Sequence, residues 1–515
     1  MSENKVTVLG KNAEERLEIL RDEKGNILLT DDQKRAVLER GRILVSASAG
    51  SGKTSTMVKR IIVMISEGTT LKNLLVLVYN NAAADELKEK LHQELFKAAC
   101  ASSGEKRDRF RQEIDELPFC HICTIHAFCQ SLIRENFDKL GISPTFDVLD
   151  ETRHASYMNR ALDDVIATYT ASGDETFCEL ADIFSQSRKE ENLKSNLIKF
   201  YGLIEIQPDE EEFERCVSEC YDSYENSKFF AILQDYYKTF FANAKNALLP
   251  IKTQLEVLAP TSKYLQSLAV AICFCDELES KSRLFDMCTL ASKYEKPRAT
   301  VSPKASDEEK LLVGYVKDYL KQFHDAIDEM KEICNRQDSL ESAHEQNAKY
   351  VKKLVEVAQT FAKKLEELKQ EDNVLSFEDL QHKALELLSH DEYELSGDFD
   401  AVFVDEYQDV NDLQNTLFWA VSRDETNMFT VGDVKQSIYR FRQAMPEIFL
   451  SRRDALNDFE CDNYPAKITL DRNFRSRSGV TENVNFLFSQ IMSRQMGSVD
   501  YNENEQLVAA ADYEE

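Results

Sequence analysis

A glycine-rich segment that directly follows a short apolar run constrains this chain more than any other feature. The run is Ile43-Leu44-Val45, and the segment A-S-A-G-S-G-K-T occupies residues 47–54. Because glycine has no Cβ, Gly50 and Gly52 allow the backbone amides of this loop to close around phosphate oxygens. A strand, a tight glycine-rich turn and a following helix predict a site for the phosphates of a nucleotide.

Each part of this loop has an expected role. Lys53 is placed to reach the β- and γ-phosphates, and Thr54 is placed to hold Mg²⁺. The helix expected from Ser55 to Ile65 offers the positive end of its dipole to the anion. The residues expected to bind the nucleotide here are Ala47, Ser48, Ala49, Gly50, Ser51, Gly52, Lys53, Thr54 and Ser55.

Four short apolar runs have the length and composition of buried parallel strands. More than 300 residues separate the second run from the third, far more than an ordinary crossover connection needs. We therefore expect an α/β fold, a P-loop lobe with a parallel sheet, interrupted by a large and mostly helical inserted subdomain. The runs are Ile43–Val45, Leu74–Val78, Ala401–Val404 and Met428–Val431.

The inserted part, about residues 151–375, is polar and rich in helix formers. Near its end a narrow apolar seam predicts a long amphipathic helix that packs within the chain, and Ser376 marks the expected boundary. The seam alternates spacings of three and four residues over Val351, Leu354, Ala358, Phe361, Leu365 and Leu368.

The composition excludes several classes of protein. With 15 glycines and 9 prolines in 515 residues, a turn-dense all-β fold is excluded. A net charge of −29 excludes a small, uniformly basic nucleic-acid binder, although an acidic chain can still bind nucleic acid in a local groove. Twelve sparse cysteines and the lack of an apolar run of membrane-spanning length predict a cytoplasmic protein with no membrane association.

An apolar strand that ends in two carboxylates provides the second chemical signal. Val402-Phe403-Val404 leads into Asp405 and Glu406. In a Walker B site, Asp405 would hold Mg²⁺ and Glu406 would orient and deprotonate the attacking water. Alone, such a pair is commonly a surface feature, but together with the phosphate loop it favours catalysis.

The third signal follows the fourth apolar run, in residues 431–442. Gln436, near the end of that run, could sense the γ-phosphate. Phe441 lies between Arg440 and Arg442, which suits stacking of a base beside a phosphate backbone. By itself, a buried phenylalanine flanked by salt-bridged arginines would be the favoured interpretation.

Together these motifs resemble the N-terminal part of a UvrD/RecB-like superfamily-1 helicase, and within that group the AddA component of the AddAB-type ATP-dependent helicase/nucleases. The matching motifs run in family order from Leu29 to Asn485. The resemblance implies a RecA-like ATP-binding lobe in residues 1–150 and 376–460, the inserted helical subdomain in 151–375, and the start of a second motor lobe in 461–515.

The resemblance also implies roles for further residues. Gln33 would read adenine, and Thr124 and His126 would contact the DNA strand. Phe474 would stack on adenine, and Arg475 would approach the γ-phosphate. The resemblance thus implies that the catalytic residues are Lys53, Glu406, Gln436 and Arg475, and that the metal ligands are Thr54 and Asp405.

The chain departs from the family pattern in two places. Family members usually have Thr-Phe-Thr-Asn after the second strand, where this chain has Val78-Tyr79-Asn80-Asn81. Tyr79 can still stack on a base and Asn80 can still donate to phosphate, so Tyr79, Asn80 and Asn81 are expected DNA contacts along with Phe441. The chain ends at Glu515, soon after the second lobe begins, which predicts a fragment with weak Mg·ATP binding and slow turnover on its own.

The expected function is therefore the ATP-binding motor of a DNA helicase with 3′–5′ translocation, active in double-strand break repair and recombination. ATP and Mg²⁺ are the expected cofactors. The expected partners are single- and double-stranded DNA and an AddB-type protein.

Two alternatives remain open at this point: a P-loop ATPase of another class, and a non-catalytic DNA-binding module. The motif with Gln436 and Phe441 and the segment 473–476 argue against the first. Intact Lys53 and Glu406 argue against the second.

Overall fold

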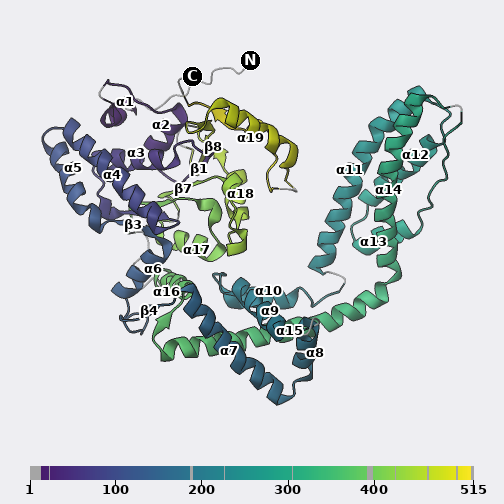
Figure 1. Cartoon of the computed structure of the whole chain (residues 1–515), viewed down its shortest axis with the longest axis horizontal. Helices are drawn as coiled ribbons and strands as arrows, with labels where there is room; N and C mark the ends of the chain where they lie inside the picture. Colours follow the sequence, from purple (N-terminus) through teal and green to yellow (C-terminus); the bar gives the residue numbers. More distant parts are fainter. Residues whose placement is uncertain are drawn as a thin grey trace. The chain divides into compact units, whose positions relative to one another are not determined.

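The computed structural model of the chain shows two compact units (Figure 1). The first unit contains residues 1–160, 201–210 and 365–515, and the second contains residues 161–200 and 211–364. The structure describes residues 13–22, 24–185, 190–224, 227–303, 305–390, 398–423, 425–460, 463–494 and 497–511.

The first unit is built on a parallel sheet that contains seven strands among the described residues, in the order β3-β2-β6-β7-β1-β9-β8. The short strands β10 and β11 form a separate pair, as do β4 and β5. The strands are β1 Ile43–Ala47, β2 Leu74–Val78, β3 His121–Thr124, β4 Asp147–Val148, β5 Val374–Leu375, β6 Ala401–Val404, β7 Met428–Gly432, β8 Asn457–Asp458, β9 Ala466–Leu470, β10 Arg472–Asn473 and β11 Val508–Ala509.

Helices cover both faces of this sheet, which explains why its central strands are apolar almost throughout. In β2, Val76 belongs to a core formed with α3, α4 and α5, whereas Leu75 and Leu77 belong to a core formed with α6, α16 and α17. The helices assigned wholly to this unit are α1 Ala13–Leu17, α2 Asp31–Leu38, α3 Lys53–Ser66, α4 Asn81–Ala101, α5 Glu105–Glu116, α6 Ile125–Glu135, α16 Phe377–Ser389, α17 Asp412–Val421, α18 Pro446–Ala455 and α19 Ser478–Ile491.

Short 3-10 turns complete the first unit, and three of them follow the ends of β6 and β7. The turns are η1 Glu18–Leu20, η2 Leu71–Asn73, η3 Leu117–Phe119, η5 Tyr407–Asp409, η6 Val434–Gln436 and η7 Arg440–Arg442. Four helices contribute residues to both units: α7 Glu151–Ser172, α9 Glu190–Ile204, α10 Glu210–Glu219 and α15 Gln337–Glu371.

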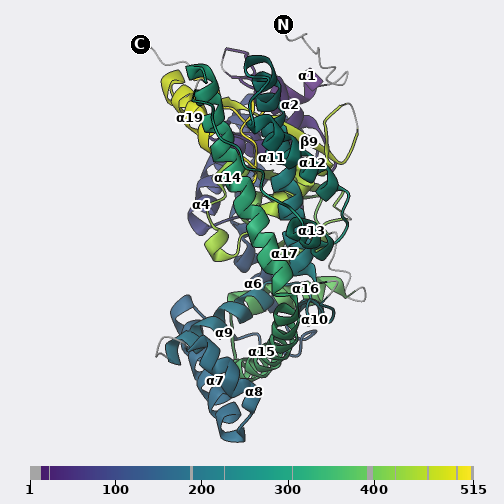
Figure 2. The same cartoon turned by 90° about the vertical axis from the view of Figure 1, so that its right-hand side faces the viewer.

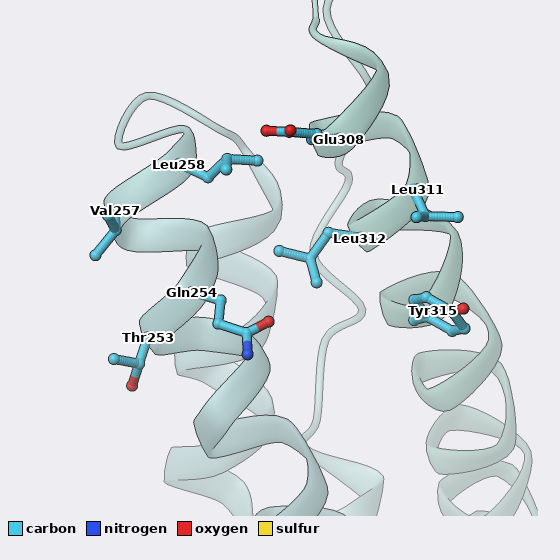
Figure 3. A pocket seen from close by; sticks show the side chains of 8 residues that line it. All are labelled: Thr253, Gln254, Val257, Leu258, Glu308, Leu311, Leu312 and Tyr315. Carbon is cyan, nitrogen blue, oxygen red and sulfur yellow. The ribbon is translucent and has the colours of Figure 1, made fainter.

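The described residues of the second unit form helices and the loops that connect them, without a strand. Its helices α11 to α14 lie side by side (Figure 2) and share one aromatic-rich core. In this core Phe241, Phe274 and Phe323 meet edge to face. Near one end of this bundle, an apolar groove opens between α11 and α14, and Leu258 and Leu312 point into it from opposite sides (Figure 3). The helices that lie wholly in this unit are α8 Glu175–Phe184, α11 Lys228–Leu258, α12 Tyr264–Glu279, α13 Leu284–Ser292 and α14 Asp307–Asn335.

The predicted fold class is confirmed. All four apolar runs are strands of the parallel sheet, and the described elements over the more than 200 residues between β4 and β5 are helices. The predicted seam lies on α15, where Ala358, Phe361 and Leu365 are buried. Ser376 caps α16 by accepting a hydrogen bond from the Asp379 amide. In the described part of the chain, no helix is long and apolar enough to cross a membrane.

Candidate nucleotide and nucleic-acid site

The predicted site residues of the first unit gather at one edge of its sheet. In a parallel sheet all carboxyl ends lie on the same edge, and ligands bind there. Along this edge, the strand order places Thr124 at the end of β3, Tyr79 after β2, Asp405 after β6, Asp433 after β7 and Ser48 after β1. The residues expected to bind ATP and those expected to bind DNA therefore share one edge, with β6 and β7 at its centre.

The phosphate loop depends on two glycines in the left-handed conformation. Gly50 has φ +70° and Gly52 has φ +82°, and Gly52 directly precedes α3. A Cβ atom at Gly50 would lie 2.9 Å from Cβ of Arg475 and 3.0 Å from Cγ of Asn473. At Gly50, both the backbone conformation and the close approach of the segment after β9 require glycine.

The phosphate-loop lysine meets the acidic pair of β6. Nζ of Lys53 lies 3.0 Å from Oε2 of Glu406, although the two residues are 353 positions apart in the sequence. Burial, and then the neighbouring Glu406 carboxylate, raise the pKa of Asp405 to about 6, while the Lys53 ammonium acts in the opposite direction. The same two causes raise the pKa of Asp409 to about 6. The site concentrates negative charge that a cation would relieve.

The two residues expected to hold adenine lie beside the same loop. Nε2 of Gln33 donates to the carbonyl oxygen of Ser51 at 2.9 Å, and the Thr30 capping box fixes Gln33 at the start of α2. The backbone amide of Phe474 donates to the carbonyl oxygen of Gly50 at 2.9 Å. A small pocket is lined by both Gln33 and Phe474. The Gln33 amide in this wall is buried and bonded within the protein, because its oxygen also accepts from the Thr30 amide at 3.0 Å, whereas the Phe474 ring is 43% exposed.

Asn473 holds the segment after β9 against the phosphate loop. Its Nδ2 donates to the carbonyl oxygen of Ala49 at 2.8 Å. Its Oδ1 accepts from the backbone amides of Arg475, at 2.9 Å, and Ser476, at 2.7 Å. These bonds place the backbone of Arg475 beside the loop.

Gln436 is fixed within the turn that follows β7. Its Nε2 donates to Oδ2 of Asp433 at 2.8 Å. Lys435 pairs with the same carboxylate at 3.1 Å and with Glu505 at 3.0 Å. Asp433 therefore organises the turn that carries the residue expected to sense the γ-phosphate.

Aromatic rings cluster beyond that turn, around a residue that the sequence did not single out. The rings of Tyr79 and Tyr439 stack with centroids 5.2 Å apart, and Phe441 lies 6.0 Å from Tyr439. The Arg442 guanidinium lies near the rings of Tyr439 and Phe441, 5.7 and 5.8 Å from their centroids. Phe441 is 77% exposed, so the interpretation of a buried core ring does not hold. We name Tyr79, Tyr439, Phe441 and Arg442 the aromatic cluster.

The other expected DNA contacts have structural partners of their own. Oδ1 of Asn80 accepts from the Ala83 amide and caps α4, with Asn81 as the first residue of that helix, and the Thr124 hydroxyl accepts from the Ala127 amide and caps α6. The ring of His126 packs on Phe377, with centroids 4.5 Å apart. Burial lowers the pKa of His126. The described contacts place the His126 ring against α16 and not in the aromatic cluster.

Three residues of the site were not predicted: Gln408, Tyr439 and Asn473. Tyr439 and Asn473 lie inside segments that the sequence did mark, and Gln408 lies two residues beyond the predicted acidic pair. At all three positions a polar or aromatic side chain has no distinctive spacing. Their roles depend on contacts with residues distant in the sequence, so no local pattern could have identified them.

A glycine-rich loop between a parallel strand and a helix, with an acidic strand end against its lysine, defines an α/β protein of the P-loop nucleotide-binding class. The chain belongs to the UvrD/REP helicase family: the family's N-terminal domain matches residues 29–268 and 232–457. This confirms the family predicted from the motifs, and it removes the alternative of a P-loop ATPase of another class.

Relatives within this family match the chain over most of its length. An ATP-dependent helicase/nuclease subunit from Clostridium perfringens (strain SM101 / Type A) is 31% identical over 518 residues, which cover 94% of this chain and 40% of the relative. Proteins of the same name from Carboxydothermus hydrogenoformans and Lactobacillus gasseri are also 31% identical, covering 94% of this chain and 41% and 42% of the relatives. The chain thus spans about two fifths of the length of these relatives.

Replacing Gly50 by Ala should weaken binding of a fluorescent ATP analogue by about tenfold or more, because the new methyl group meets the segment at 473–475. Gly25→Ala is the matched control, since Gly25 has φ +79° but nothing within 4 Å of the added atom. Equal losses of affinity for the ATP analogue in the two variants would show that the close approach of residues 473–475 to Gly50 does not affect nucleotide binding.

Replacing Asp405 by Asn should stabilise the nucleotide-free protein at pH 7.5 by on the order of 2 kcal/mol more than at pH 4.5. The folded-state pKa of Asp405, about 6, lies above its ordinary value of 3.8, so the wild-type protein loses stability as the pH rises through 6. Asparagine stays neutral and avoids this loss. Urea unfolding at both pH values measures the difference, and the exposed Asp115→Asn variant is the control. A gain in the free energy of unfolding that is equal at the two pH values would contradict the raised pKa of Asp405.

Proposed function

We propose that this chain is the ATP-binding motor portion of a DNA helicase that moves 3′ to 5′ along single-stranded DNA in double-strand break repair and recombination. One observation supports this most strongly. The residues expected to bind ATP and an exposed cluster of aromatic rings lie on the same edge of one sheet, and the segment after β7 contributes to both.

ATP would bind with its phosphates on the loop and its base beside Gln33 and Phe474. The Thr54 hydroxyl and the Asp405 carboxylate are oxygen donors of the kind that Mg²⁺ prefers, and the raised pKa of Asp405 reflects charge that a cation would offset. Mg²⁺ bound there would neutralise charge on the β- and γ-phosphates. Lys53 would exchange its contact with Glu406 for one with the phosphates.

Hydrolysis of ATP would depend on the positioning of the attacking water and on neutralisation of the negative charge on the phosphates. Glu406, held by Lys53 and by Gln408, would orient and deprotonate the attacking water. Gln436 would sense the γ-phosphate from the turn after β7. Arg475 would approach it from the segment after β9.

The aromatic cluster would hold the DNA strand by stacking bases, which tolerates any sequence because every base has a flat face. ATP would favour a closed arrangement of two motor lobes and hydrolysis would release it, so that the strand advances with each cycle. The relatives are named as subunits of a helicase/nuclease, which supports an AddB-type partner for a longer protein. We expect this motor to act in the cytoplasm and on single- and double-stranded DNA.

The 515-residue chain should hydrolyse Mg·ATP slowly and faster when single-stranded DNA is added. Lys53→Ala should lower the rate by about 100-fold or more, because the charge that Lys53 presents to the phosphates is lost. Single-turnover hydrolysis of labelled ATP measures both rates, and the exposed Lys72→Ala serves as control. ATP hydrolysis that DNA does not stimulate would contradict the motor function. DNA binding without hydrolysis would favour a non-catalytic DNA-binding module.

Replacing Phe441 by Ala should weaken binding of a labelled oligothymidylate by about 1–3 kcal/mol, the usual value of one base-stacking ring. The matched control is Ile438→Ala, because Ile438 lies in the same segment and is 68% exposed but has no ring. Fluorescence anisotropy at constant salt measures both affinities. Unchanged affinity in Phe441→Ala would place the DNA strand elsewhere.

A further inference from the structure

A buried arginine of α3 holds the helix that carries Gln33. Arg60 is 2% exposed. Its Nη1 donates to the carbonyl oxygen of Ala36 at 2.8 Å and also to the carbonyl oxygen of Glu39, both at the C-terminal end of α2. The last carbonyl groups of a helix have no partner within the helix, and the helix dipole attracts a cation to this end. Arg60 therefore binds the end of α2 from a neighbouring helix.

Aromatic rings of the sheet fix the other side of this guanidinium. The guanidinium carbon of Arg60 lies 4.4 Å from the ring centroid of Phe429 in β7 and 6.0 Å from that of Phe403 in β6. A guanidinium at such distances is attracted to the face of an aromatic ring. The side chain thus joins α2 to the central strands, and the rings limit its freedom to follow a shift of α2.

The place of Arg60 along α3 relates it to the phosphate loop. Lys53 and Thr54 begin this helix, and Arg60 follows Lys53 by seven residues, which is about two turns. Val37 and Leu38 of α2 share a buried cluster with Val63 of α3. One helix therefore carries both the residues expected to bind the phosphates and the residue that holds α2.

Gln33 lies one helical turn before the carbonyl group that Arg60 holds, because Ala36 follows it by three residues. At the start of α2, the Thr30 capping box and the bond to Ser51 fix the same glutamine. A Cβ atom at Gly52 would lie only 3.2 Å from Nε2 of Gln33. With the amide this close to the phosphate loop, a small shift of α2 would change its position relative to a bound nucleotide.

The Gln33 amide keeps the capacity to bind a base. Its nitrogen uses one of two hydrogens for Ser51, and its oxygen uses one of two lone pairs for the Thr30 amide. The second hydrogen and the second lone pair match N7 and the 6-amino group of adenine, as in the usual pairing of glutamine with this base. Guanine has an acceptor oxygen at position 6, which the amide oxygen would repel. Selection of the base therefore depends on where α2 holds Gln33.

We propose that Arg60 is a positioning residue that sets Gln33 against the phosphate loop, so that the site selects adenine over guanine. This inference rests on the proposed function and names the residue on which its base selection depends. Without Arg60, α2 keeps the cap at its start but loses the bonds that tie its end to α3. The base is then selected less strictly, while the phosphates still reach Lys53.

Two substitutions of Arg60 test this role. Arg60→Met removes every donor but keeps an unbranched apolar chain, and Arg60→Lys keeps the charge and a donor without the planar group. The matched control is Arg452→Met. Arg452 is also a buried arginine beside a ring, 4.8 Å from the centroid of Trp419, but it pairs with Glu425 and belongs to α18. Its loss tests whether removal of any buried arginine has the same effect.

The test compares ATP with GTP on the full chain. We would measure the affinities of wild type and the three variants for ribose-labelled ATP and GTP in the presence of Mg²⁺, and the ratio of the two dissociation constants is the base preference. Magnesium tripolyphosphate, which has no base, serves as a probe of the phosphate loop alone. The thermal midpoint and the DNA-stimulated hydrolysis of ATP are measured in parallel.

Wild type should prefer ATP by about tenfold or more, the usual effect of two hydrogen bonds that one base makes and the other does not. In Arg60→Met the preference should fall to within about threefold of one, while the affinity for tripolyphosphate stays within about threefold of wild type. Arg60→Lys should lie between the two. Arg452→Met should lower the thermal midpoint but keep the preference.

A double variant shows whether Arg60 acts through Gln33. Gln33→Ala alone should remove most of the preference for ATP, and adding Arg60→Met should lower it no further, because two residues that act on one contact are not additive. A merely structural role of Arg60 would instead weaken the binding of ATP, GTP and tripolyphosphate alike in both backgrounds.

An Arg60→Met protein that keeps the wild-type preference would overturn the inference, as would one that loses affinity for tripolyphosphate as strongly as for ATP. If Arg60→Met does not fold, an Arg60→Lys protein with the full wild-type preference would overturn it. A wild type that binds ATP and GTP equally would also reject the inference, but DNA-stimulated hydrolysis would leave the proposed function standing. A wild type that binds no nucleotide would reject both.

Discussion

The site depends on the entry of β6 into the sheet between β2 and β7. The Asp405 amide donates to the carbonyl oxygen of Leu77 at 3.0 Å, and this bond holds the acidic pair at the level of the phosphate loop. More than 300 residues lie between the two strands, so their pairing closes a very long loop. Loop-closure entropy grows only with the logarithm of length, which is why such an insertion is compatible with a stable sheet.

The order of the strands places the residues expected to bind DNA and those expected to bind the nucleotide on different sides of the same sheet edge. On one side, Thr124 ends β3 and Tyr79 follows β2. On the other side, the phosphate loop follows β1, and Phe474 follows the short strand β10, which comes after β9. The strands between them, β6 and β7, end in the residues that contact both sides. Neighbouring strands are joined by ladders of backbone hydrogen bonds, and most of the expected ligand-binding residues lie in the turns that follow the strands.

The sequence allowed correct predictions where a local pattern of residue types is typical of one structure. Buried strands and a phosphate loop have local patterns, so the central sheet and the position of Lys53 were predictable. The two patterns together predicted that Lys53 and the acidic pair serve one nucleotide site, and in the structure Lys53 contacts Glu406. Gln408 and Tyr439 were not predictable, because a glutamine or tyrosine acquires a role only from distant partners. His126 illustrates the converse, since its ring packs on Phe377 of α16, a contact that no local pattern encodes. The predicted domain boundaries at 150, 375 and 460 stay predictions.

Glu406 combines a carboxylate with a left-handed backbone, at φ 49° and ψ 45°. Residues other than glycine and asparagine rarely adopt this conformation, and it costs on the order of 1–2 kcal/mol. A laboratory selection for heat resistance would therefore enrich glycine or asparagine at this position and discard the group expected to activate water. Libraries of variants that are screened for higher thermal stability should keep glutamate at position 406. At this position, a residue that raises the stability would lower the rate of hydrolysis.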